Sequence, residues 1–217
     1  MNRFKVAIAI TLGLTSVGVF QARAAEIEPT DLDSLRLGGT IVGPVGPEVD
    51  TTFVNTSGNG VGDLSSRVSC PRDIDDCVPP ENPVGTVYTY IHEVTPGVDF
   101  PNDDPFPEPD TFRPFERIEA FRLNFPAAGF NGVAGYSFSQ ADDATGNELI
   151  RVETTPDGSL IWTIPADVEW EPEETISFFW QTTQAPSGPN GSYSLMGDGR
   201  MSGAVGPLPT ALNREPE

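Results

Sequence analysis

The chain has 217 residues, including 22 glycines, 22 prolines and 13 phenylalanines, and a formal net charge of −20 at pH 7. Hydrophobic residues make up 37% of the sequence, too many for a disordered chain, while glycine and proline are too frequent for a helical bundle. The excess of 32 acidic over 12 basic residues argues against nucleic acids and anionic membranes as partners, because phosphate groups are bound by clustered Lys and Arg.

Residues 1–24 have the pattern of a secretory signal peptide. Arg3 and Lys5 precede an uncharged apolar stretch at 6–20, and Ala22-Arg23-Ala24 supplies small residues for signal peptidase. A membrane anchor, the alternative, needs about 20 apolar residues. Cleavage after Ala24 would remove three of the 12 basic residues and no acidic one, leaving 193 residues with a charge of −23 and no lysine. We therefore expect a secreted, periplasmic or cell-surface protein that is not inserted in a membrane once the signal is removed.

Cys70 and Cys77 are the only cysteines, and an even number in an exported chain predicts a disulfide. The bond would pin a short acidic loop and contribute about 2 kcal/mol in the chain-entropy account. A metal site and a redox pair are the alternatives. A metal would need a further soft ligand, for which His92 is the only histidine, and redox cysteines usually have two residues between them.

Strands dominate the predicted secondary structure, because apolar and aromatic residues alternate with period two between Gly, Pro, Asn and Asp. The nine predicted strands are 40–42, 51–54, 87–94, 119–125, 133–139, 148–153, 159–164, 175–181 and 192–196. Asp157-Gly158 marks a hairpin, and 30–37 could form one helical turn. The pattern predicts an all-β fold, an antiparallel β-sandwich of jelly-roll type.

Other segments are predicted to be loops. Residues 96–114 carry six prolines among acidic residues, and proline cannot donate to a sheet ladder, so an extended surface loop is expected. Gly58, Gly60 and Gly62 also suggest a loop. The sandwich domain is predicted at 25–200, followed by a flexible tail at 201–217.

No catalytic constellation is apparent, and no catalytic residue is predicted. A catalytic triad would have to use His92, and no nucleophile turn, HExxH motif or phosphate-binding loop occurs. We interpret His92 as a polar residue at the sheet surface beside Tyr88 and Tyr90. A pair of carboxylates for glycoside hydrolysis carries no signal among 32 acidic residues.

Calcium is the one candidate cofactor, because clustered carboxylates are its usual protein ligands. Two groups qualify, and neither has the EF-hand spacing: Asp73, Asp75 and Asp76 in the disulfide loop, and Asp103, Asp104, Glu108 and Asp110 in the proline-rich loop. A solvated acidic loop is the alternative reading of each group.

An exposed tryptophan could stack on a sugar ring. Trp162 and Trp180 lie on apolar strand faces and are expected to be buried, whereas Trp170 is flanked by Glu169 and Glu171. Trp170 is therefore the candidate for glycan stacking.

The stretch 176–195, with Gly206-Pro207-Leu208-Pro209 after it and 129–138 before it, resembles the C-terminal part of bacterial exosortase-associated exported proteins of the PEP-CTERM type. The likeness covers about a third of the chain and includes no catalytic motif. It implies a surface or matrix component. The chain departs from that family after Glu217, where a Pro-Glu-Pro motif, an apolar helix and a basic cluster would follow.

The sequence thus predicts a secreted acidic protein that works without catalysis as an extracellular or surface-matrix interaction protein. Its partner would be a protein or polysaccharide of the cell surface, or a second copy of the chain. A carbohydrate-binding module or carbohydrate-active domain is the alternative. The acidic excess with no lysine also suggests adaptation to a salty medium, where screening reduces self-repulsion.

Overall fold

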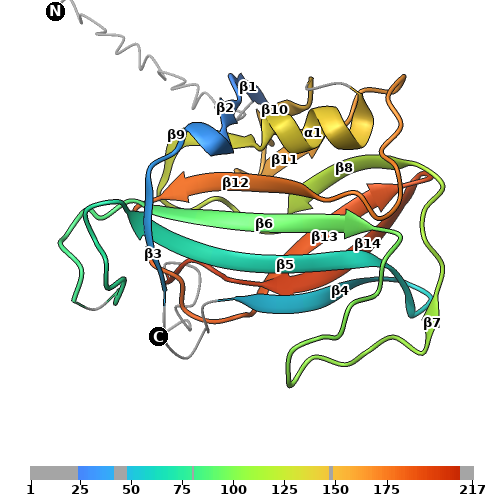
Figure 1. Ribbon diagram of the computed structural model, residues 1–217, viewed down its shortest axis with the longest axis horizontal. Coiled ribbons are helices and arrows are strands. Elements are labelled where there is room, and N and C mark those ends of the chain that lie inside the picture. Colours follow the sequence, from blue (N-terminus) through green and yellow to red (C-terminus); the bar gives the residue numbers. More distant parts are fainter. Residues whose placement is uncertain (1–23, 42–47, 80, 147–148, 211–217) are drawn as a thin grey trace, which may run out of the picture.

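The computed structural model describes residues 24–41, 48–79, 81–146 and 149–210, so the predicted signal peptide, except Ala24, lies outside the described part, as do residues 211–217 of the predicted tail. Fourteen strands form a single sheet in the order β1-β10-β11-β8-β13-β14-β4-β5-β6-β12-β9-β2, with β3 and β7 paired to β5 (Figure 1). The elements are β1 (Ala25–Ile27), β2 (Thr30–Asp31), the 3-10 turn η1 (Leu32–Ser34), β3 (Leu37–Thr40), β4 (Val49–Asn55), β5 (Asn59–Pro71), β6 (Tyr88–Pro96), β7 (Thr111–Phe112), β8 (Ile118–Leu123), β9 (Phe130–Tyr136), α1 (Phe138–Thr145), β10 (Arg151–Thr154), β11 (Leu160–Thr163), β12 (Ile176–Thr182), β13 (Gly191–Gly197) and β14 (Arg200–Gly206).

The sheet curls so that its two halves face each other across an aromatic core. Phe121 on β8 stacks on Phe178 of β12, with ring centroids 5.1 Å apart. Phe121 also lies parallel to Tyr193 of β13, at a centroid distance of 6.1 Å. At the open side of the curl, Trp162 of β11 donates its indole N–H to the main-chain oxygen of Gly135 on β9. Burial of these rings is the main favourable contribution to folding, because apolar area is removed from water.

The all-β prediction is confirmed, but the sandwich of about nine strands is wrong. β14 pairs with β13 along its length and with β4 at Ser202 and Gly203, so the hydrogen-bonded ladder continues from one half to the other. Two separate sheets therefore do not exist in the described part of the chain. The strand number is higher partly because β1, β2, β3 and β7 have only two to four residues, too few to show an alternating pattern.

The longest strand, β5, occupies a segment that begins where the sequence suggested a loop. Its glycines have a packing role: a Cβ at Gly60 would lie 2.7 Å from the Phe112 ring, and one at Gly62 would lie 2.9 Å from Pro96. β5 pairs with β4 and β6 on its two sides. Pairing on both sides supplies main-chain hydrogen bonds that outweigh the low strand propensity of glycine and serine.

Three further expectations have mixed outcomes. The hairpin at Asp157-Gly158 is confirmed, with Thr154 opposite Leu160 and Gly158 at a φ of 81°. The flexible tail is wrong over 201–210, because this stretch contains most of β14 and Pro209 bridges to Pro186. The strand predicted at 133–139 ends early at α1, which Ser137 caps through its hydroxyl.

The chain from η1 through β3 forms a strap across the outer side of the sheet (Figure 1). It lies close to the disulfide loop, where Gly39 donates its N–H to the oxygen of Ile74 at 3.0 Å. A Cβ at Gly38 would lie 2.1 Å from the oxygen of Pro71, and one at Gly39 would lie 2.1 Å from that of Asp75. Only glycine allows this approach. Among the described helices, none has the length and hydropathy required to cross a membrane.

Candidate functional site

The disulfide is the sequence-predicted feature that the structure confirms directly. Cys70 at the end of β5 is bonded to Cys77, and both are buried. The carboxylates of Asp73, Asp75 and Asp76 lie in the loop that the bond closes, and all three residues are exposed. Within the described residues, no three His, Cys, Asp or Glu side chains are spaced to hold a metal ion.

Trp170 is not an exposed stacking platform, so that prediction is wrong. The residue is 3% exposed, its indole N–H donates to the oxygen of Glu174 at 2.9 Å, and its ring packs edge-on against Phe178. The flanking Glu169 and Glu171 suggested that Trp170 is exposed. Consecutive side chains point in different directions, however, so the two glutamates are exposed while Trp170 is buried. A buried indole has no face free for a sugar.

His92 is also buried, contrary to its expected place at the sheet surface. It is 0% exposed, and its ring lies in the core beside Phe121 and Tyr193. Burial, with a smaller effect of the Arg67 charge, lowers the pKa of His92 to about 3. The ring is therefore neutral at ordinary pH and has no access to a substrate.

The proline-rich loop does not gather its acidic side chains into one group. Asp103 and Glu108 instead accept main-chain hydrogen bonds, from the N–H groups of Asp50 at 3.2 Å and Asn102 at 2.6 Å. Asp104 and Asp110 are exposed. The loop crosses in front of β5 and β4 before it reaches β7, and these bonds fasten it there (Figure 1).

Between this loop and the outer face of β4, β5 and β6 lies a cleft of about 340 Å³. Alternation along the strands places its polar side chains on this face, away from the aromatic core. The cleft is lined by four carboxylates together with hydroxyl, amide and aromatic groups: Glu48, Asp50, Thr51, Asp63, Leu64, Ser65, Glu93, Thr95, Phe100, Pro101, Asn102 and Thr175. Arg67 forms an ion pair with Glu93, which neutralises one of the four carboxylates.

Asp63 is the least exposed carboxylate of the cleft. It is 7% exposed, its Oδ2 accepts a hydrogen bond from the N–H of Phe100, and its buried Oδ1 accepts none from the described residues. Burial raises the pKa of Asp63 to about 7, opposed by the Phe100 hydrogen bond and reinforced by the charges of Asp99, Glu108 and Asp50. The ionised form of a buried carboxylate surrounded by like charges is unfavourable unless a cation compensates it, and this cost is why the pKa rises.

Other oxygens approach the same place from β4 and from the loop. Thr52 pairs with Asp63 across β4 and β5. Its Oγ1 lies 2.9 Å from Oδ1 of Asn102 and 3.3 Å from Oδ1 of Asp99. A hydroxyl has one hydrogen to donate, so it can satisfy only one of these two acceptors at a time.

The sequence did not indicate Asp63, since it follows the glycines that suggested a loop. Its one signal is weak: Asp63, Ser65 and Arg67 alternate with Leu64, Ser66 and Val68, as expected for a strand with one polar face.

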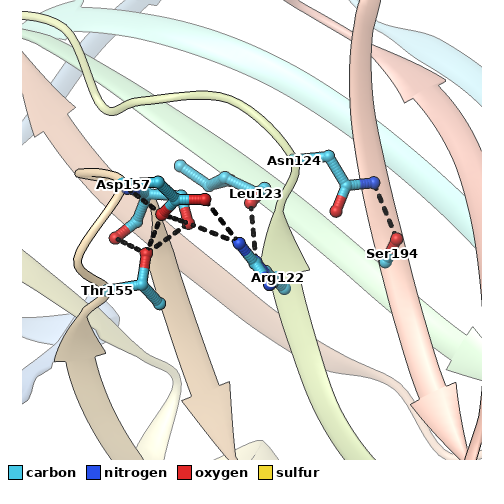
Figure 2. Close-up of polar contacts among 7 residues, drawn as sticks. Arg122, Leu123, Asn124, Thr155, Asp157 and Ser194 are labelled. Carbon is cyan, nitrogen blue, oxygen red and sulfur yellow. Dashed lines mark hydrogen bonds and ion pairs between the residues drawn. The ribbon is translucent and has the colours of Figure 1, made fainter. Parts of the chain in front are cut away.

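A second polar cluster, on the other half of the sheet, has a structural role (Figure 2). Arg122 of β8 forms an ion pair with Asp157 at 2.7 Å, and Asn124 donates to the Ser194 hydroxyl at 2.7 Å. Hydrogen bonds from Thr155 and Ser159, with a smaller effect of Arg122, lower the pKa of Asp157 to about 2. The ion pair fastens the β10–β11 hairpin to β8, the Asn124 contact joins the end of β8 to β13, and we assign no ligand to this cluster.

Comparison with known proteins identifies no relative: no protein-family model, curated protein or solved structure matches the chain. The resemblance to exosortase-associated proteins stays a prediction.

Proposed function

We propose that this chain is an exported acidic interaction protein of the cell surface or extracellular matrix, which binds its partner without catalysis through the carboxylate-lined cleft. The observation that carries the proposal is the position of that cleft. It opens on the outer face of the sheet, while the inner face packs against aromatic side chains. The disulfide adds support, because such bonds persist in oxidising compartments.

Export can be tested with the full-length chain carrying a C-terminal tag in a bacterial host. We expect the protein in the periplasm or medium, with Ala25 as its first residue. A cytoplasmic protein that keeps residues 1–24 would overturn this part of the proposal.

Binding can be tested with the purified exported protein, an isolated cell-surface fraction and light scattering for self-association. We expect binding or assembly that Glu48→Gln/Asp50→Asn weakens, since these carboxylates line the cleft. The matched control is Asp73→Asn/Asp75→Asn, which removes the same charge from the exposed disulfide loop. Equal effects of both pairs would show that net charge, not the cleft, matters.

Carbohydrate binding is a second candidate function, now assigned to a different aromatic residue. Phe100 is 57% exposed and lines the cleft beside Asn102 and Asp50. An exposed ring next to amide and carboxylate groups is suited to a sugar face and its hydroxyls. Binding to a polysaccharide panel that Phe100→Ala abolishes and Met201→Ala preserves would favour this function. Uniformly absent binding would exclude it for the panel.

A further inference from the structure

We propose that a calcium site lies at the edge of the cleft next to the loop, formed by the carboxylates of Asp63 and Asp99, the amide oxygen of Asn102 and the hydroxyl of Thr52. Asp63 and Asn102 also line the cleft, whereas Asp99 and Thr52 reach the site through the Thr52 hydroxyl contacts. These are not the two acidic groups that the sequence suggested. The inference goes beyond the proposed function, since a cation can bind here whatever partner the cleft takes.

The first argument is the unsatisfied carboxylate. Asp63 is more than nine-tenths buried, and its Oδ1 has no hydrogen-bond donor among the described residues, although its Oδ2 is bonded to Phe100. A buried polar atom without a partner costs about 1–3 kcal/mol, and more when it is charged. A bound cation would remove that cost.

The second argument is the convergence of oxygens beside it. Thr52 lies opposite Asp63, and its hydroxyl contacts the side-chain oxygens of both Asn102 and Asp99. The amide of Asn102 is oriented by its other end, because its Nδ2 donates to the oxygen of Pro107 at 2.9 Å. Its Oδ1 therefore faces Thr52 as an acceptor. Two acceptors that share one hydroxyl hydrogen form an electron-rich group suited to a cation.

The donor types favour calcium. Carboxylate, amide and hydroxyl oxygens are hard ligands, and calcium accepts a variable geometry supplied by a loop, whereas magnesium requires a near-ideal octahedron. Two carboxylates are few for a high-affinity site. We therefore expect a dissociation constant on the order of 10⁻⁴ M or weaker, in the range of extracellular calcium modules.

Calcium here would connect the proline-rich loop to the sheet. Asp99 and Asn102 belong to the loop, whereas Thr52 and Asp63 belong to β4 and β5. The loop is already held by the reciprocal main-chain and side-chain bonds between Asp50 and Asp103. The ion would add a further attachment next to the Phe100–Asp63 hydrogen bond and so fix one wall of the cleft.

The test is calcium titration of the purified protein, whether or not residues 1–24 have been removed, after EDTA treatment and dialysis, near pH 8 so that carboxylates are ionised. We expect saturable heat in calorimetry and a rise in Tm of a few degrees at about 10 mM calcium, compared with sodium chloride of equal ionic strength. Magnesium should give a smaller rise. Asp63→Asn and Asp99→Asn should each reduce the calcium affinity at least about tenfold.

The control is the double variant Asp73→Asn/Asp75→Asn, whose two changes lie in the disulfide loop. This variant should bind calcium with the affinity of the wild type. Absence of saturable binding at about 10 mM calcium would overturn the proposal. Unchanged affinity in both single variants would also overturn it. These readouts use purified protein, so they are independent of the export and partner assays.

Discussion

The imidazole of His92 on β6 lies against the phenol ring of Tyr193 on β13, with ring centroids 4.4 Å apart, in the core between the two halves of the sheet. Its Nδ1 is 3.0 Å from the Ser66 hydroxyl. Phe121 covers another side of the ring at a centroid distance of 5.7 Å. The only histidine of the chain is thus part of the aromatic core.

This position predicts a loss of stability in acid. The pKa of His92 is about 3 in the folded protein and ordinarily 6.5, so below pH 6.5 the unfolded chain binds a proton that the folded protein excludes. The free energy of unfolding should therefore fall by up to about 1.4 kcal/mol per pH unit between pH 6.5 and 3 from this group alone. Urea unfolding at several pH values should show a smaller decline for His92→Gln and His92→Phe than for the wild type. Equal slopes would contradict the prediction.

Trp162→Phe should destabilise the closure of the curled sheet. The indole N–H of Trp162 donates to the oxygen of Gly135 at 2.9 Å, and the side chain is fully buried. Phenylalanine keeps an aromatic ring but leaves this oxygen without that donor and opens a small cavity, at a cost of about 2 kcal/mol in urea unfolding. Ile161→Val, on the outer side of the same strand, should cost clearly less. Equal losses would show that the hydrogen bond is unimportant.

Gly39→Ala should displace the strap. The added methyl carbon would lie 2.1 Å from the oxygen of Asp75, and a main-chain atom cannot rotate away. We expect a loss of about 1–3 kcal/mol, as for other overpacked sites, and a fall in Tm. Gly203→Ala is the matched control, since its nearest atom would be 3.9 Å away. A Tm for Gly39→Ala within error of the Gly203→Ala value would contradict the predicted clash.

Salt should stabilise the protein. The described structure shows three ion pairs, Arg67–Glu93, Arg122–Asp157 and Arg200–Asp198, while the sequence carries 32 acidic residues. Screening of the remaining like charges should outweigh the weakening of three partly exposed pairs. Thermal unfolding in EDTA should give a Tm that rises from low to about 1 M sodium chloride, where the screening length is about 3 Å. A Tm independent of salt would count against adaptation to a salty medium.

Local patterns predicted the local elements well. Tyr88–Pro96 and Ile176–Thr182 are strands close to their expected bounds, because each is rich in aromatic and β-branched residues, and nearly all of their residues are buried. The Asp157-Gly158 turn was predictable because its glycine adopts a positive φ that other residues avoid. The disulfide followed from having two cysteines only.

The candidate site could not be predicted in this way. Thr52 and Asp99 are 47 positions apart, and neither lies in an acidic group that stands out by spacing. The glycines and serines of β5 gave no strand signal, and the glutamates beside Trp170 gave no indication of its contact with Phe178. The burial of β5 and of Trp170 depends on segments that are distant in the sequence.

By itself, the sequence determined an acidic, strand-rich chain with one disulfide, because composition, period-two alternation and cysteine number are local properties. Tertiary structure alone decided that the strands form one curled sheet, that His92 and Trp170 are buried, and that Asp63 accepts a hydrogen bond from the main chain of Phe100. The physical reason is that β14 joins β4 and β13, and the loop folds back on β5, through hydrogen bonds between distant residues. Such pairing leaves no periodic trace in either partner.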